Sequence, residues 1–118
     1  MKTHRDLDVW KKSVSLVTSI YEITKSFPKE EIYGLTNQIR RAAVSVPSNI
    51  AEGSARQGNK EFIQFLYISL GSLTELEMQL IIASNLKYLS EESFISLMSK
   101  QKEIGKMLTG LIRYIKKK

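Results

Sequence analysis

The chain of 118 residues carries 18 basic and 12 acidic side chains, a net charge of +6, and it has no cysteine and one histidine. Without cysteine it has neither a disulfide framework nor a thiolate metal site, and no uninterrupted apolar run approaches the roughly 20 residues that span a bilayer. The N-terminus shows no apolar segment typical of a signal peptide. We therefore expect a cytoplasmic protein without a membrane partner, made of one domain over residues 1–118.

The first predicted helix covers residues 6–27, where apolar side chains recur at spacings of three and four. Pro28 ends this helix, because the residue before a proline avoids helical geometry. Two apolar rows lie side by side on it: Leu7, Trp10, Val14, Val17, Tyr21 and Thr24 in one, Val9, Leu16, Ile20, Ile23 and Phe27 in the other. One row suffices to face a neighbouring helix, so two rows indicate further partners inside a bundle or on another subunit.

The second predicted helix begins between residues 29 and 36 and runs to about Arg56, with Pro47 in its interior. An interior proline removes a backbone donor and costs about 3 kcal/mol unless neighbouring groups absorb the kink. The side chains that would bond the freed carbonyls are Ser45, Ser48 and Asn49. We expect one continuous, kinked helix, since no turn residues precede Pro47. The alternative is a new helix that starts at Pro47.

Two glycines and an asparagine mark the predicted boundary between this helix and the next. Gly53, Gly58 and Asn59 are expected to supply the helix exit and the next N-cap. Gly71 falls inside the third predicted helix at a propensity cost of about 1 kcal/mol relative to alanine, and a close helix crossing would explain it.

The third and fourth predicted helices keep strict 4-3 or 3-4 spacings of apolar positions, the pattern of left-handed bundle packing. These positions are Phe62, Leu66, Ser69, Leu73, Leu76, Leu80 and Ala83, then Phe94, Leu97, Gln101, Ile104, Leu108, Leu111 and Ile115. A short link over residues 85–89 joins the two helices, and Ser90 is the expected N-cap of the last. The pattern predicts an all-α, antiparallel up-down-up-down four-helix bundle.

The residues that enzymes of this fold class use are missing. The only histidine is His4, so the Glu-x-x-His pairs of carboxylate di-iron bundles are absent, and no Gly-x-x-x-x-Gly-Lys loop occurs. Glu75 and Glu77 lie two residues apart and point to different helix faces. We expect a protein that is not an enzyme and has no metal or cofactor.

The positive charge is concentrated at the C-terminal end. Residues 100–118 hold seven basic side chains and one acidic one, which equals the net charge of the whole chain. Lys102, Lys106, Arg113 and Lys117 fall on one side of the last helix, in a stripe about 22 Å long. Such a stripe suits the phosphates of a nucleic acid. The alternative is a solvated face that only keeps the protein soluble.

Three arginines near the second helix are further candidates for phosphate contacts: Arg40 and Arg41 before Pro47, and Arg56 after it. For Arg41 the alternative is an ion pair with a glutamate such as Glu52, within the chain or across a subunit interface. This structural interpretation is the one we favour, because a small polar face with one acid suits packing.

Several segments resemble the bacterial four helix bundle protein family, also called the 23S rRNA intervening-sequence protein family. The most specific is Arg-Arg-Ala-Ala-Val-Ser-Val-Pro-Ser-Asn-Ile-Ala-Glu-Gly at residues 40–53, and the others are residues 6–10, 26–31, 33–35, 61–62 and 71–77. The resemblance covers roughly residues 6–115. It implies an antiparallel four-helix protomer in a homopentameric ring. It also implies kinship to the accessory factor of diversity-generating retroelements, which binds nucleic acid and a reverse transcriptase.

Together these observations predict a non-enzymatic, pentameric helical bundle that binds RNA or DNA backbone through Lys102, Lys106, Arg113 and Lys117, with contributions from Arg40, Arg41 and Arg56. The alternative is an adaptor or scaffold that binds an unidentified protein partner and has no direct role with nucleic acid. The sequence names neither the nucleic acid nor that partner.

Overall fold

The computed structural model describes residues 3–118 and contains four long helices: α1 (Asp8–Thr24), α2 (Leu35–Ser54), α3 (Asn59–Asn85) and α4 (Glu91–Lys116). Two short 3-10 turns, η1 (His4–Asp6) and η2 (Lys29–Glu31), precede α1 and α2. No strand occurs in this described part of the chain.

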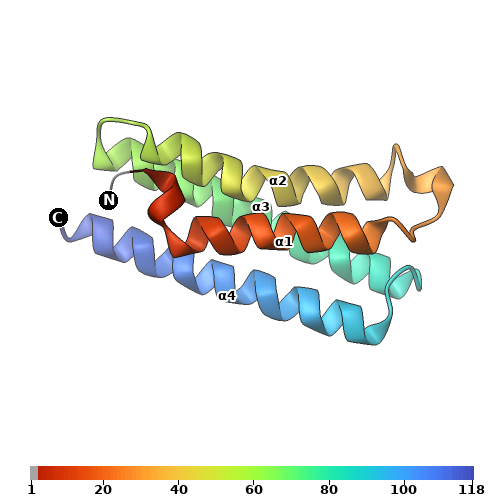
Figure 1. Cartoon of the computed structure of the whole chain (residues 1–118). Helices are drawn as coiled ribbons and strands as arrows, with labels where there is room; N and C mark the ends of the chain where they lie inside the picture. Colours follow the sequence, from red (N-terminus) through yellow and green to blue (C-terminus); the bar gives the residue numbers. More distant parts are fainter. Residues whose placement is uncertain (1–2) are drawn as a thin grey trace.

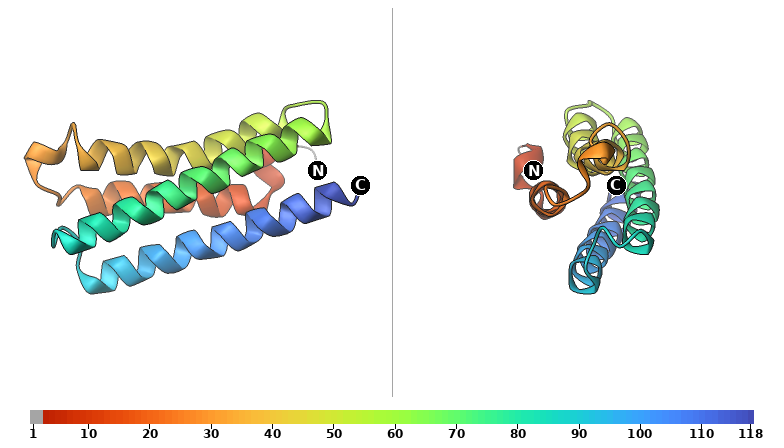
Figure 2. Two further views of the ribbon diagram at one scale, coloured as in Figure 1. Left: turned by 180° about the vertical axis from the view of Figure 1, so that it is seen from behind. Right: turned by 90° about the vertical axis from the view of Figure 1, so that its right-hand side faces the viewer.

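Each helix packs against its neighbours in sequence, and α4 closes the bundle against α1 (Figures 1 and 2). The diagonal pairs, α1 with α3 and α2 with α4, make no close backbone approach, and α2 with α3 forms the most extensive interface. The turn η1 and the C-terminal end of α4 lie at the same end of a rod measuring 46 × 24 × 20 Å. The predicted up-down-up-down four-helix bundle is therefore confirmed.

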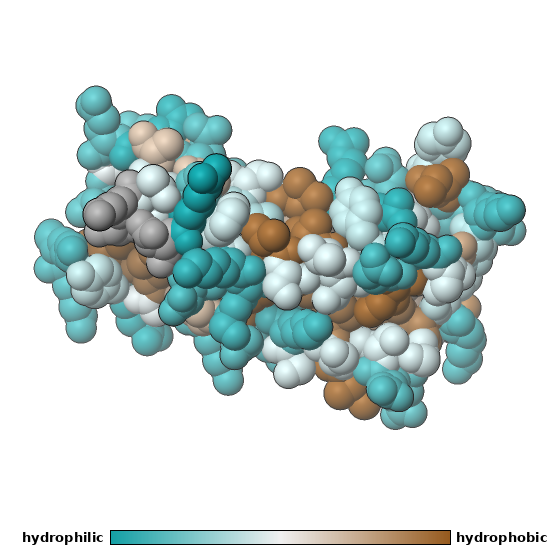
Figure 3. Space-filling view, in the orientation of Figure 1, coloured by the Kyte–Doolittle hydropathy of each residue, from teal (hydrophilic) through white to brown (hydrophobic). Residues whose placement is uncertain are grey.

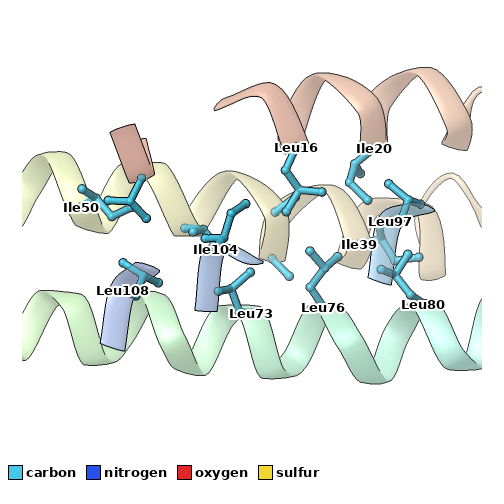
Figure 4. Close-up of a cluster of buried hydrophobic side chains, with 14 of the residues drawn as sticks. Leu16, Ile20, Ile39, Ile50, Leu73, Leu76, Leu80, Leu97, Ile104 and Leu108 are labelled. Carbon is cyan, nitrogen blue, oxygen red and sulfur yellow. The ribbon is translucent and has the colours of Figure 1, made fainter. Parts of the chain in front are cut away.

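The core is built from the positions that the helical spacing predicts. All four helices send side chains into it (Figure 4), among them Leu16, Ile20, Ile39, Ile50, Leu73, Leu76, Leu80, Leu97, Ile104 and Leu108. Each of these side chains is at most 3% exposed. Burying one leucine or isoleucine contributes about 1.5–3 kcal/mol, so these buried side chains provide most of the free energy that holds the four helices together.

The second helix is continuous through Pro47, as predicted, and Pro47 itself is buried. Two side-chain donors bond the two backbone carbonyls that directly precede the proline. The amide of Asn49 donates to the Ser45 carbonyl at 2.8 Å, and the Ser69 hydroxyl of α3 donates to the Val46 carbonyl at 2.9 Å. Donors from both α2 and α3 therefore help to hold the backbone at this point.

The predicted roles of the two serines near Pro47 are wrong. The hydroxyl of Ser45 lies 2.8 Å from that of Ser72, so the two form a hydrogen bond between α2 and α3 rather than a bond to a freed carbonyl. Ser48 is exposed and makes no side-chain hydrogen bond to any described residue. Its position on the solvent side of α2 explains this.

The glycine predictions also need correction. Gly53 lies within the last turn of α2 and not at an exit, and a Cβ there would lie 2.7 Å from Phe65 Cβ, so this glycine permits close packing of α2 on α3. Gly71 is exposed, and a Cβ there would have nothing within 4 Å, so no crossing within the protomer explains it. Gly58 is the N-cap of α3, one residue earlier than Asn59.

Helix ends differ from the predictions by two or three residues. The first helix spans 8–24 rather than 6–27, because Leu7 is extended and the chain turns at residues 25–27 before Pro28. The second ends at Ser54 rather than Arg56. Ser90 caps α4 as predicted, since its hydroxyl accepts from the Ser93 N–H at 3.1 Å.

Glu31 joins the connections at one end of the bundle. One carboxylate oxygen accepts from the Leu35 N–H at 3.1 Å, which caps α2, and the other accepts from the Tyr88 hydroxyl at 3.0 Å in the α3–α4 link. The hydrogen bond to Glu31, followed by burial and the negative charges of Glu31 and Glu30, raises the pKa of Tyr88 above its usual value.

Candidate nucleic-acid interface

Three of the four predicted stripe residues line one open groove between α3 and α4. Lys102, Lys106 and Arg113 are exposed along its α4 edge. The groove has a volume of about 520 Å³, and the helices that form it are seen from behind in Figure 2, left. We call it the α3/α4 groove, and its lining consists of Leu70, Lys102, Gly105, Lys106, Thr109 and Arg113.

The hollow arises from the small side chains on this face of α4. Gly105 and Thr109 lie four residues apart, one turn along the helix, between the long cationic side chains. A Cβ at Gly105 would meet only Leu73 Cδ1, at 3.9 Å. Leu70 contributes an apolar side chain from α3. The groove therefore combines an apolar floor with a cationic edge.

The cations of this groove have no partners among the described residues of the protein. Over residues 3–118, Lys102, Lys106 and Arg113 make no ion pair and no side-chain hydrogen bond, and none of the described lining residues is acidic. Side chains that are exposed and unpaired keep their full charge available to a ligand.

The groove is continued at one end by an aromatic residue. Tyr67 lies one turn before Leu70 on α3, and its hydroxyl accepts from Lys116 Nζ at 3.1 Å. The same ammonium lies 5.5 Å from the centroid of the Tyr67 ring, which is 49% exposed. Lys117, the fourth predicted residue, is exposed at the C-cap of α4 and does not line the groove.

Arg40 lies on a different side of the bundle and has a structural role. It is half-buried, its Nε donates to Thr24 Oγ1 at 2.9 Å, and its guanidinium lies 4.6 Å from the centroid of the Tyr21 ring. These contacts join α2 to α1. The structure does not bring Arg40 together with the α4 cations.

Arg56 and Arg41 are also separate from the groove. Arg56 pairs with Glu52 at 3.0 Å and lies 5.0 Å from the Phe65 ring centroid. The structure does not pair Arg41 with Glu52 within the protomer, because Glu52 is one helical turn from Arg56 but about 16 Å along α2 from Arg41. Arg41 is exposed beside Glu75 in a groove of about 240 Å³ between α2 and α3.

Four residues at this site escape the sequence analysis: Tyr67, Leu70, Gly105 and Thr109. The spacing of Gly105 and Thr109 beside Lys102 and Lys106 would have indicated a shallow face on α4. The identity of the α3 side chains across the groove depends on how the two helices cross, which spacing alone does not give.

The structure gives little support to a metal site or to a membrane-spanning helix. No cluster of three or more His, Asp or Glu side chains suited to a metal occurs within the described residues. The helix Asn59–Asn85 is long and apolar enough to cross a membrane by length and composition, with 33% of its most apolar window buried. The core helix of a soluble bundle passes the same test, so this carries little weight.

Known proteins place the chain in a family without assigning a function. Residues 5–110 match the model of the 23S rRNA-intervening sequence protein family. No curated protein matches the sequence. A solved structure of a protein of unknown function from the S23 ribosomal protein family of Bacteroides thetaiotaomicron VPI-5482 superposes with a TM-score of 0.83 and 28% identity, covering 89% of this chain and 95% of that one. With the bundle and the residue 40–53 run, the family match is decisive: this chain belongs to the 23S rRNA-intervening sequence protein family.

Proposed function

We propose that this protein is a non-enzymatic, oligomeric bundle that binds the backbone of RNA or DNA through the α3/α4 groove. The observation that carries the proposal is the placement of Lys102, Lys106 and Arg113 on one groove, exposed and without an acidic partner among the described residues. Lys117 and Lys116 extend the same positive field at the end of α4. Contacts of this kind bind phosphates and carry no sequence readout by themselves.

Arg40 and Arg56 are not part of this proposal, because contacts within the protomer occupy their side chains. Arg41 stays a candidate for a subunit interface: it is exposed, has no ion pair among the described residues and lies near Glu75.

We further propose that the protein assembles with itself, as the pentameric ring that the family resemblance implies. An exposed row on α3, formed by Ile68, Gly71, Glu75, Met78 and Ile82, follows a seven-residue repeat, and its three large apolar side chains are 39–53% exposed. Gly71, which has no neighbour in the protomer, would let another helix approach closely.

The first helix supports the same proposal. Val14 and Tyr21, from one of its two apolar rows, are 37% and 40% exposed. Apolar patches reach the surface of the α1 side of the bundle between polar ones (Figure 3). Exposed apolar surface of this kind is typical of protein contacts. A ring would also repeat the α3/α4 groove five times and strengthen its field.

Because apolar surface is exposed on both α1 and α3, an adaptor that binds another protein remains the second candidate. Salt dependence separates the two functions. Binding of labelled RNA or DNA that neutralises three phosphates per protomer should weaken with salt at a log–log slope of about −2 to −3 for each engaged protomer. Absence of any gel shift with mixed RNA and duplex DNA at micromolar protein and low salt would refute nucleic-acid binding.

Light scattering tests the assembly separately. The expected mass is about five times the 13.5 kDa of one chain. Met78→Glu, which places a charge in the exposed α3 row, should lower that mass, whereas Glu92→Lys at the exposed start of α4 should not. A monomer at high protein concentration would refute the ring.

A further inference from the structure

We infer that the α3/α4 groove selects single-stranded nucleic acid over duplex, with bases against Leu70 and Gly105 and one base stacked on Tyr67. This inference rests on the proposed function and adds the class of nucleic acid that the groove accepts. Three features of the groove carry it.

The first feature is the shape of the site. Neighbouring helices pack with their axes about 8–10 Å apart, so the open α3/α4 groove is narrow. A duplex presents a convex surface much wider than this groove. A duplex would contact the cationic edge but would not reach the floor of the α3/α4 groove, whereas one flexible strand fits along this groove.

The second feature is the chemistry of the floor. Leu70 is apolar, and Gly105 and Thr109 are small, so the floor of this open groove of about 520 Å³ is surface that gains nothing from a phosphate. The faces of unstacked bases are flat and apolar, and they are accessible only in a single strand. A cationic edge beside an apolar floor matches a strand whose phosphates and bases lie on opposite sides.

The third feature is the tyrosine at the end of the groove. Tyr67 is half exposed, and its hydrogen bond to Lys116 Nζ holds the ring in place beside a cation. The turn from Tyr67 to Leu70 on α3 runs alongside the turn from Lys116 to Arg113 on α4. A strand that follows the groove therefore reaches the ring without changing direction. Positive grooves with an aromatic platform are typical of proteins that bind single strands.

The chain offers a matched control for this residue. Tyr114 is also exposed, at 58%, and Lys118 Nζ lies 4.6 Å from the centroid of its ring. Tyr114 borders a different pocket, with Leu7 and Arg56, at the end of the bundle. The two tyrosines share residue type, exposure and a lysine neighbour, and they differ in position relative to the groove.

Fluorescence anisotropy with the full-length protein tests the inference. The probes are a labelled 20-nucleotide single strand of mixed sequence, as RNA and as DNA, and the duplex of the same sequence at the same salt. We expect the single strand to bind at least about tenfold tighter. Tyr67→Ala should weaken single-strand binding by about 5- to 150-fold, the range for loss of one stacked base, and should change duplex binding less than about twofold. Tyr114→Ala should leave both unchanged.

Tyr67→Phe keeps the ring and removes the hydroxyl that Lys116 binds, so it should retain most of the single-strand affinity. Equal or tighter duplex binding would overturn the inference and leave the proposed function standing, as would equal losses for Tyr67→Ala and Tyr114→Ala. No binding of either probe would overturn the proposed function itself.

Discussion

Helix α4 borders one groove on its α3 side and another on its α1 side, and the lysines of this helix have different neighbours in the two grooves. On the α3 side, Lys102 and Lys106 have no partner within residues 3–118. On the α1 side, Lys100 donates to Ser19 Oγ at 3.3 Å, and Lys12 pairs with Glu103 at 3.4 Å. The seven residues from Lys100 to Lys106 thus contribute to two grooves. The groove on the α3 side keeps its positive charge, and Glu103 partly neutralises the groove on the α1 side. The positive charge available to a ligand on each side of α4 therefore depends on whether a carboxylate lies on that side, more than on the total charge of the helix.

The two grooves also differ in volume. The α1/α4 groove, lined by Lys12, Ser15, Leu16, Lys100, Glu103 and Ile104, has a volume of about 130 Å³, against about 520 Å³ on the α3 side. Buried Leu16 and Ile104 fill the α1 side, whereas Gly105 and Thr109 leave the α3 side open. Only the α3 side therefore has both unpaired charge and space for a ligand.

The largest expected effect comes from reversing the charge of the α3/α4 groove. The triple substitution Lys102→Glu, Lys106→Glu and Arg113→Glu should weaken single-strand binding by more than about 100-fold, because three phosphate contacts become repulsive. The bundle should keep its circular dichroism and oligomeric mass, since all three side chains are exposed and unpaired.

The control for this experiment changes the net charge by the same amount on the other side. Lys11→Glu, Lys12→Glu and Lys100→Glu alter three exposed lysines on or next to the α1/α4 groove. Anisotropy should show a loss of less than about tenfold, from the weaker long-range field alone. Equal losses in the two triple variants would show that net charge and not the α3/α4 groove controls binding.

A smaller effect should follow from filling the hollow without changing its charge. Gly105→Leu places an apolar side chain on the groove floor and should reduce single-strand affinity by about tenfold, a loss expected from excluding one base. Duplex binding should stay within about twofold. A titration of both probes with this variant measures the two affinities, and unchanged single-strand binding would show that the floor is not used.

Substitutions of Gly105 and Gly53 by alanine should change the stability of the protein in opposite directions. Gly105→Ala should stabilise the protein by up to about 1 kcal/mol, because alanine is the better helix former and its Cβ meets only Leu73 Cδ1, at 3.9 Å. Gly53→Ala should instead destabilise it by about 1–3 kcal/mol, since its Cβ would lie 2.7 Å from Phe65 Cβ. Urea denaturation compares the two, and equal effects would contradict the packing described.

The smallest effect should come from removing the carboxylate on the α1 side. Glu103→Gln frees Lys12 and should raise affinity at low salt by about two- to threefold through the long-range field. Stability should fall by less than about 1 kcal/mol, because both side chains of the pair are about half exposed, 49% and 57%. Anisotropy at 50 and 200 mM salt checks this, and a fall in affinity would show that Glu103 supports binding.

Most of the fold follows from local spacing. The 4-3 repeats identify α3 and α4 with their buried faces, and the lack of turn residues before Pro47 predicts one continuous helix. Such patterns are readable because each buried position depends on its own helix. The roles of Gly53 and Gly71 do not follow from local spacing. Whether a glycine contacts another helix depends on how two helices cross, and no single segment encodes that crossing.

The site is predicted in part for the same reason. Lys102, Lys106 and Arg113 share one side of a single helix, so their spacing shows them together. Leu70 and Tyr67 come from another helix, and only the packing places them across the groove. Glu52 is one of the partners that the sequence offers for Arg41, although Arg56, one turn from Glu52, is nearer by spacing alone.

The most direct test of the account locates the bound strand on the protein. A single-stranded RNA of 20 nucleotides containing 4-thiouridine is photo-cross-linked to the native assembly, and the attached peptides are identified by mass spectrometry. The account predicts cross-links to the α3 turn that contains Tyr67 and Leu70 and to the α4 segment from Lys102 to Arg113. Cross-links concentrated around Lys12, Ser15 and Lys100 would contradict it.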